Sequence, residues 1–106
     1  MAPSRQRLCA SKEMEVGEAR RFEIGDTAIV LVHCEDGFRA VADTCSHEDY
    51  SLSEGEVLAD ECEIECWKHG STFSLVTGQP LTLPATKPVA VYEVRVEGGD
   101  VYAVVR

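Results

Sequence analysis

Two short segments of the chain each bring a cysteine close to a histidine. One residue separates Cys45 from His47, and two residues separate Cys66 from His69. Thiolate and imidazole are the ligands that soft and borderline metal ions prefer in proteins. Eighteen residues lie between the two pairs, which is enough chain for a strand excursion that returns the second loop to face the first. The fold must therefore bring two short loops together around one metal centre, and this requirement constrains it more than any other feature.

Runs of β-branched and aromatic residues recur at short intervals, whereas helical periodicity is poor. Residues 27–34 form such a run, and residues 38–43 follow it after a turn that contains glycine. Near the end of the chain, residues 90–96 alternate apolar with polar or small side chains, and two glycines lead into a further run at 101–105. This pattern predicts two β-hairpins. Short strands separated by such turns favour an all-β fold, a small antiparallel β-sandwich or barrel of two layers.

Three cysteines, Cys9, Cys34 and Cys62, lie outside the two pairs. The chain has 5 cysteines, and because this number is odd they cannot all be joined in disulfides within the chain. Residues 61–66 alternate between glutamate and an apolar or sulfur-containing side chain, which predicts a strand with its cysteines on the inner face. We expect the three extra cysteines to be structural thiols, because free cysteine commonly packs as a small core residue. His33 is expected to be an ordinary strand residue.

Size and charge limit the class of protein. A chain of 106 residues is expected to form a single domain, residues 1–106. Its net charge of -9 argues against nucleic-acid binding, which needs cationic side chains to neutralise phosphates. Residues 48–65 contain acidic side chains and no lysine or arginine. These carboxylates either attract a basic patch of a partner protein or simply keep the surface solvated.

Neither membrane insertion nor export is expected. No apolar run of about 18 residues, the length that spans a bilayer, occurs in the sequence. The first residues include basic side chains, but no apolar stretch of signal-peptide length follows them. We therefore expect a cytoplasmic protein without a membrane partner, and we expect it to be a monomer.

The mixed ligand set suits a cluster of two iron ions bridged by two sulfides. Cys45 and Cys66 would hold one iron ion as thiolates, and His47 and His69 would hold the other as neutral imidazoles. The alternative is a zinc ion, which also binds two cysteines and two histidines in a tetrahedron. Zinc fingers usually pair cysteine with cysteine and histidine with histidine beside a helix, whereas each pair here is mixed and its surroundings are predicted to be β. The residues therefore favour a 2Fe–2S cluster over zinc.

Further segments accompany the ligand pairs. In chain order they are Cys45-Ser46-His47, Leu52-Ser53-Glu54-Gly55, Cys66-Trp67-Lys68-His69-Gly70-Ser71-Thr72-Phe73, Thr77-Gly78 and Leu83-Pro84-Ala85-Thr86-Lys87-Pro88. With these segments the chain resembles the Rieske ferredoxins, from about Leu8 to Val105. The resemblance implies the Rieske fold, in which two β-layers carry a smaller cluster-binding subdomain, here about residues 43–88. It also implies that a loop at residues 83–85 covers the cluster from a third side.

Departures from other Rieske proteins narrow the resemblance. Members from respiratory cytochrome complexes carry an extra cysteine in each ligand loop and join the two in a disulfide. This chain has Trp67 and Lys68 in the second loop and no cysteine at residues 48–50 of the first, so no such bridge can form. The chain looks instead like the soluble ferredoxins of ring-hydroxylating dioxygenases. It also looks like actinobacterial members linked to iron–sulfur assembly genes.

The resemblance implies one-electron transfer between an NAD(P)H-dependent flavoprotein reductase and a terminal acceptor, such as a Rieske non-haem iron oxygenase. No nucleophile–base pair is evident, so no catalytic residue is expected. The alternatives are a small Rieske subunit of a nitrite reductase and a cluster-sensing module linked to iron–sulfur assembly. High-potential relatives have a serine and a tyrosine that donate to cluster sulfur, where this chain has Ser71 and Phe73. This difference implies a modest reduction potential within the Rieske range.

Overall fold

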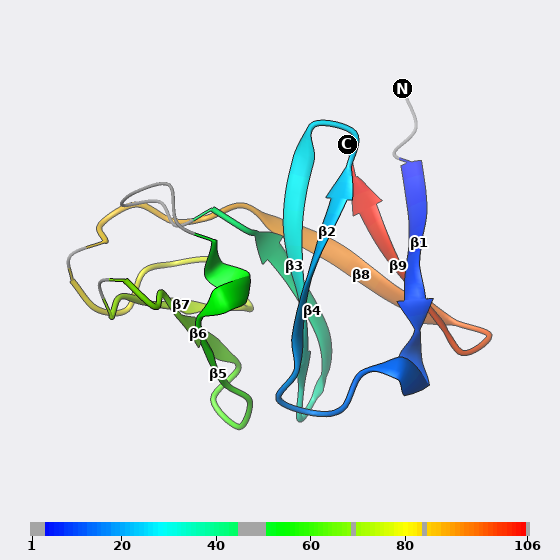
Figure 1. Ribbon diagram of the computed structural model, residues 1–106, viewed down its shortest axis with the longest axis horizontal. Coiled ribbons are helices and arrows are strands. Elements are labelled where there is room, and N and C mark those ends of the chain that lie inside the picture. The colour runs from blue at the N-terminus through cyan, green and yellow to red at the C-terminus, as the bar shows by residue number, and fades with distance from the viewer. Residues whose placement is uncertain (1–3, 45–50, 69, 84, 106) are drawn as a thin grey trace.

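Strands make up most of the computed structural model, which describes residues 4–44, 51–68, 70–83 and 85–105. Within these ranges two antiparallel sheets are formed (Figure 1). The strands are β1 Ser4–Ala10, β2 Ala19–Ile24, β3 Thr27–Cys34, β4 Gly37–Ala42, β5 Glu56–Leu58, β6 Glu63–Glu65, β7 Thr72–Ser74, β8 Val91–Glu97 and β9 Asp100–Val105. The large sheet has the order β1-β9-β8-β4-β3-β2, and the small sheet the order β5-β6-β7. Two short 3-10 helices, η1 Ser11–Glu13 and η2 Leu52–Glu54, complete the elements. The expected all-β fold is confirmed.

Both predicted hairpins are present in the large sheet. Strands β3 and β4 pair in a register that closes on Cys34 opposite Gly37. Strands β8 and β9 pair from Glu93 opposite Val104 to Glu97 opposite Asp100. The two glycines between β8 and β9 have positive φ values of 59° and 81°, which is the backbone conformation that a tight hairpin turn requires. Local turn chemistry and β-branched runs therefore account for most of the large sheet.

Strand β3 is buried on both of its faces, and this explains its continuous apolar run. Val30 and Val32 belong to the core between the large and the small sheet. Ile29 and Leu31, which point the other way, belong to a second core enclosed by the curled large sheet. All four side chains are fully buried. Strand β3 thus carries both cores and is the wall on which the small sheet packs.

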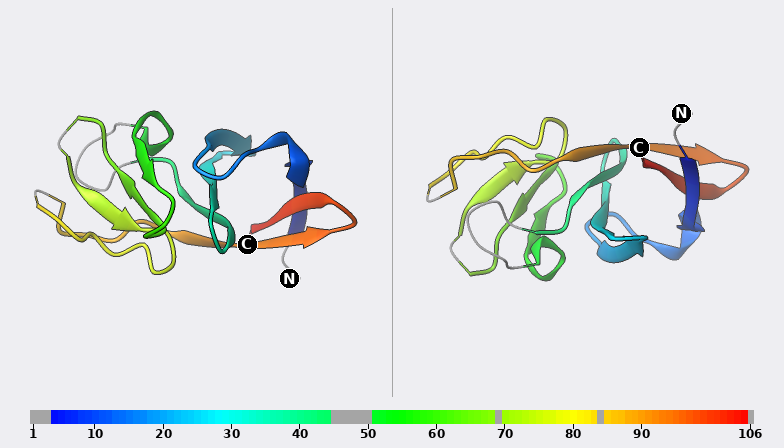
Figure 2. Two further views of the ribbon diagram at one scale, coloured as in Figure 1. Left: turned by 90° about the horizontal axis from the view of Figure 1, so that it is seen from below. Right: turned by 90° about the horizontal axis from the view of Figure 1, so that it is seen from above.

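The small sheet lies at one end of the long axis of the molecule, and the β8–β9 hairpin lies towards the other end (Figure 2). Strand β6 is its middle strand, paired with β5 and β7 on either side. It is shorter than the expected strand at 61–66, because Cys62 lies in the preceding turn with a positive φ of 56°. The predicted inner face is nevertheless confirmed, since Cys62, Ile64 and Cys66 are all buried. Cys66 follows the last residue of β6 directly.

None of the described segments forms a helix with the length and apolar character that crossing a bilayer requires.

Candidate metal centre

Of the four predicted ligands, Cys66 is the one that the structure describes. Its side chain is fully buried at the end of β6, in the core between the two sheets. Cys45, His47 and His69 lie outside the described residues. The arrangement of the site is therefore built from Cys66 and from the residues that flank the other three ligands.

The second ligand loop, residues 66–71, is closed by hydrogen bonds between its own ends. The Cys66 amide donates to the Ser71 carbonyl oxygen at 2.7 Å, and the Gly70 amide donates to the Cys66 carbonyl oxygen at 2.9 Å. Gly70 has a positive φ of 75°, a conformation that glycine adopts without steric cost. The described residues at the two ends of this connection from β6 to β7 are thus held to each other, and Cys66 is fixed at one of these ends.

The first ligand loop, residues 45–50, has its two ends paired with each other. Thr44 and Ser51 form an isolated antiparallel bridge. The Asp43 carbonyl oxygen accepts the Leu52 amide at 2.5 Å, and the Asp43 carboxylate accepts the Ser53 amide at 2.8 Å. The first ligand loop thus follows β4 and leads into η2, and Asp43 holds the two sides of the loop together.

Asp43 is a buried carboxylate, with 2% of its surface exposed. Its second oxygen accepts a hydrogen bond from Nε of Arg21 on β2 at 3.0 Å. A charge in such a site is tolerated when it is paired and hydrogen-bonded, as it is here. Asp43 therefore connects the large sheet to both sides of the first ligand loop. Sequence analysis did not single it out, because an aspartate at the end of a strand is also typical of an ordinary turn.

A third segment, residues 81–85, lies against the second ligand loop. The Leu81 amide donates to the Thr72 carbonyl oxygen at 2.7 Å, and the Thr72 amide donates to the Thr82 hydroxyl at 2.9 Å. The Thr82 hydroxyl also lies 3.3 Å from the Gly70 carbonyl oxygen, to which it can donate. This position agrees with the loop expected at residues 83–85, of which Pro84 lies outside the described residues.

Ser71 shows whether the site suits an iron–sulfur cluster. Its side chain is fully buried, and its hydroxyl oxygen accepts the Ala85 amide at 3.1 Å. Among the described residues nothing accepts the hydroxyl proton, although buried polar hydrogens almost always have an acceptor. A sulfide or thiolate sulfur next to Cys66 would supply one. A buried thiol, and a buried hydroxyl whose proton has no acceptor among the described residues, therefore fit a 2Fe–2S cluster at this end of the small sheet.

Large apolar side chains are exposed around this end of the small sheet. Trp67, Leu81 and Leu83 expose 49%, 49% and 78% of their surfaces. Trp67 belongs to the second ligand loop, and its ring has the Lys68 ammonium 5.9 Å from its centroid. The segment that carries Leu81 and Leu83 is hydrogen-bonded to that loop and to β7. Exposed apolar groups gathered at one place commonly mark a surface that contacts another protein.

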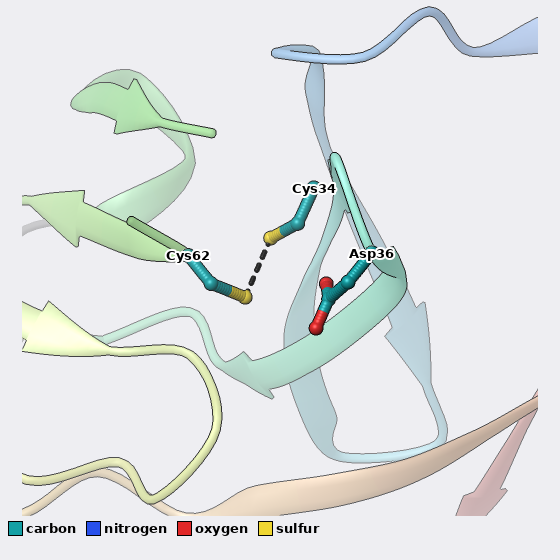
Figure 3. Close-up of side chains that lie close together, drawn as sticks. All are labelled: Cys34, Asp36 and Cys62. Atoms are coloured by element: carbon teal, nitrogen blue, oxygen red, sulfur yellow. Dashed lines mark hydrogen bonds between the residues drawn. The ribbon is translucent and has the colours of Figure 1, made fainter. Parts of the chain in front are cut away.

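The other histidine, His33, and the cysteines Cys34 and Cys62 belong to other parts of the fold than Cys66. His33 stacks on Phe38 with ring centroids 4.1 Å apart, and its Nδ1 lies 2.9 Å from the Met14 carbonyl oxygen, which confirms its structural role. Cys34 and Cys62 lie near Asp36, with all three potential ligand atoms within 4.8 Å of one another (Figure 3). This group is at the opposite end of β6 from Cys66. The sequence carries no signal for it, because the two cysteines lie 28 positions apart in the chain.

Comparison with known proteins agrees with the resemblance seen in the sequence. Residues 4–93 match the family described as the Rieske 2Fe-2S domain. The chain is 42% identical over 94 residues to the 3-phenylpropionate/cinnamic acid dioxygenase ferredoxin subunit of Escherichia coli strain K12, covering 89% of this chain and 87% of the relative.

Two solved structures have the same fold. A chain from the complex of reduced oxygenase and oxidised ferredoxin in carbazole 1,9a-dioxygenase superposes with a TM-score of 0.84 at 40% identity, covering 92% of this chain and 98% of that one. The ferredoxin of carbazole 1,9a-dioxygenase from Nocardioides aromaticivorans IC177 superposes with a TM-score of 0.92 at 28% identity, covering 100% of both chains. These relatives match nearly the whole length of the chain.

Proposed function

Since the chain belongs to the family of Rieske 2Fe–2S domains, we propose that it is a one-electron carrier whose cluster is held by Cys45, His47, Cys66 and His69. The observation that carries this proposal is the pair Cys66 and Ser71, which are joined by a backbone hydrogen bond of 2.7 Å and have fully buried side chains. Among the described residues nothing accepts the Ser71 hydroxyl proton. The two cysteines would hold one iron ion and the two histidines the other. The cluster-binding part is then residues 43–88, within the single domain 1–106.

The bound cluster would supply reversible uptake of one electron, at a potential raised by its neutral imidazole ligands. The chain's own residues hold the ligands and keep water away from the inner side of the site. The closed loop at 66–71 positions two ligands, and the Asp43 contacts position the loop that carries the other two. The Ser71 hydroxyl, whose proton has no acceptor among the described residues, would donate to a sulfur atom of the bound cluster. We propose a carrier role, which the dioxygenase ferredoxin names of the relatives support, and this role requires no catalytic residue in the chain.

We further propose that the exposed apolar group at Trp67, Leu81 and Leu83 is where partner proteins dock. Trp67 belongs to the second ligand loop, and the segment that carries Leu81 and Leu83 is hydrogen-bonded to Gly70 and Thr72. A partner seated there would therefore have its own redox centre close to the cluster. The expected electron donor is an NAD(P)H-dependent flavoprotein reductase, and the expected acceptor is a terminal oxygenase. The similarity to a ferredoxin solved in complex with its oxygenase supports an oxygenase as the acceptor. Cytoplasmic location and a monomeric state belong to the same proposal.

The function is tested with the purified, cluster-containing protein. We expect two iron ions and two sulfides per chain, a visible spectrum that bleaches on uptake of one electron, and an electron paramagnetic resonance signal in the reduced form. A flavoprotein ferredoxin reductase with NAD(P)H should reduce it, and a Rieske oxygenase should reoxidise it. A colourless zinc protein would overturn the cluster and the function. A coloured protein that exchanges electrons with neither class of partner would favour the sensing role instead.

Replacing Cys66 with serine is expected to abolish cluster binding, because serine at neutral pH does not provide the thiolate that iron prefers. Iron content should fall from two per chain to near zero, and the visible absorption should disappear. Cys9→Ser is the matched control, because Cys9 is also a buried thiol but packs in the second core, inside the large sheet. Full iron content in Cys66→Ser would contradict the proposed ligand set.

Replacing Ser71 with alanine is expected to lower the midpoint potential of the cluster. A donor to cluster sulfur stabilises the more negative, reduced form, and such a bond is worth about 1–3 kcal/mol when one partner is charged. The expected shift is therefore some tens of millivolts, since about 59 mV corresponds to 1.4 kcal/mol for one electron. Potentiometric titration followed by visible absorption measures it. Ser11→Ala, in η1 far from the site, should leave the potential unchanged, and an unchanged potential in Ser71→Ala would contradict the donor role.

A further inference from the structure

Cys34 and Cys62 face each other across the boundary between the two sheets. Cys34 is the last residue of β3, and Cys62 lies in the turn just before β6. Their Sγ atoms are 2.8 Å apart, and the residues are 0% and 8% exposed. Figure 3 shows the two side chains pointing towards each other from the two sheets, with Asp36 beside them. A disulfide bond is about 2.05 Å long, so bond formation would bring the sulfur atoms less than about 1 Å closer.

The backbone around Cys62 aims its side chain at Cys34. Cys62 is the one non-glycine residue with a positive φ in the described part of the chain, at 56°, and such a conformation is uncommon for a residue with a side chain. The Leu75 amide donates to its carbonyl oxygen at 2.9 Å. On the other side of the pair, the Glu35 amide donates to the Ala59 carbonyl oxygen at 3.3 Å. Both turns are thus fixed by backbone hydrogen bonds with the two thiols between them.

The separation of the sulfur atoms argues for a bond between them and against a shared metal ion. Two thiolates on one tetrahedral zinc ion, each about 2.3 Å from the metal, are about 3.8 Å apart. The observed 2.8 Å is much shorter. The third potential ligand, Asp36, is also engaged elsewhere, because its carboxylate accepts a hydrogen bond from Arg39 at 2.9 Å. The geometry is therefore closer to that of a disulfide than to that of a zinc site.

We propose that Cys34 and Cys62 form a redox-active dithiol that small-molecule disulfides, such as glutathione disulfide, oxidise to an intramolecular disulfide. The Cys62 thiolate attacks one sulfur of glutathione disulfide, whose S–S bond breaks and releases one glutathione. The Cys34 sulfur then attacks Cys62 in the mixed disulfide and releases the second glutathione. Each protein thiol loses one proton and one electron. The two protons and two electrons reduce glutathione disulfide to two glutathione thiols.

The order of attack follows from exposure and acidity. Cys62 retains some exposed surface, whereas Cys34 has none. Burial, the hydrogen bond to Cys62 and the nearby Cys62 and Asp36 charges raise the pKa of the Cys34 thiol. A thiol of raised pKa is a poor first nucleophile at neutral pH. Cys34 therefore suits the second, intramolecular step, in which it attacks the sulfur of Cys62 with which it is already in contact.

This dithiol is separate from the proposed cluster site. Cys62 precedes and Cys66 follows the three residues of β6, which at about 3.3 Å per residue hold the two cysteines roughly 10 Å apart along the strand. Oxidation would join the end of β3 to the start of β6 and so connect the large sheet covalently to the small one. The expected consequence is a protein more resistant to unfolding in its oxidised state, because the bond restricts the unfolded chain.

The test uses the cluster-containing protein, incubated without oxygen in glutathione buffers of increasing oxidised fraction. Each sample is quenched in acid, denatured and alkylated, and the added groups are counted by mass spectrometry. With 5 cysteines in the chain, reduced protein should gain five groups and oxidised protein three. The oxidised form should also unfold at a temperature several degrees higher, while its visible spectrum shows that the cluster is intact.

Single variants identify the bond. Cys62→Ser should gain four groups in every buffer. Cys34→Ser should lose at most one group in the oxidising buffers, because Cys62 then keeps one bound glutathione, which adds its own mass. Neither variant should show the shift in unfolding temperature. Cys9→Ser, the control, should fall from four groups to two. Five groups in wild-type protein throughout the series would overturn the proposal. A loss of two groups in Cys34→Ser, equal to the loss in the wild type, would also overturn it. So would one bound zinc ion per chain in the wild type that is absent from Cys34→Ser.

Discussion

Replacing Gly55 with alanine is expected to destabilise the protein by about 3 kcal/mol or more and to reduce cluster binding sharply. A Cβ atom at this position would lie 1.7 Å from the Glu65 carbonyl oxygen and 2.9 Å from its carbon. Both atoms belong to the backbone of β6, so no side chain can move aside. Gly55 itself has an ordinary φ of -87°. The cost therefore comes from the close approach of two backbone segments and not from the conformation of the glycine.

The Gly55→Ala substitution is also expected to disturb the metal centre, because Glu65 directly precedes Cys66. Any displacement of β6 that relieves the overlap also moves the proposed ligand at its end. A loss of this size is a large part of the 5–15 kcal/mol that stabilises a typical domain. Chemical denaturation and iron content measure the two effects.

Gly25→Ala is the matched control for the loss at Gly55. Gly25 has a positive φ of 61° but nothing within 4 Å of its added Cβ. It should lose only about 1 kcal/mol, the cost of the backbone conformation alone. Equal denaturation midpoints for Gly55→Ala and the wild type would show that the two backbones do not approach this closely.

Replacing Asp43 with alanine is expected to destabilise the protein by about 2–4 kcal/mol and to lower its iron content. The substitution removes the acceptor of the Ser53 amide and leaves space where a buried carboxylate was packed. Arg21 loses the same partner. Since these contacts connect both sides of the first ligand loop to the large sheet, their loss releases the loop that carries Cys45 and His47.

The Asp43→Asn variant separates the effect of the side chain's shape from the effect of its negative charge. Its amide oxygen can still accept from the Ser53 amide, but it lacks the negative charge that faces Arg21, so its stability and iron content should be intermediate. Asp100→Ala is the surface control, because Asp100 also pairs with an arginine, Arg7, but in an exposed position. It should leave the iron content unchanged. Wild-type stability and full iron content in Asp43→Ala would remove the positioning role of this residue.

Features that depend on neighbouring residues in the chain could be predicted from the sequence. The β3–β4 and β8–β9 hairpins follow from β-branched runs joined by glycine-containing turns. The alternation at residues 61–66 correctly predicted which side chains are buried, because side chains of an extended chain alternate between faces. The mixed cysteine–histidine pairs identified a Rieske centre, and the family match bears this out. The assignment of individual ligands stays a prediction, since three of them lie outside the described residues.

The contacts between distant segments were decided only by the tertiary structure. Asp43 meets Ser53, Gly55 meets Glu65, and Cys34 meets Cys62 across 28 residues of chain. Periodicity says which face of a strand is buried but not which residue of another segment lies opposite. That depends on how the small sheet packs on β3, which is set by the shared core and not by either segment alone. The sequence by itself thus determined two hairpins and a metal chemistry, and the packing of the two sheets decided what supports that centre and which cysteines meet.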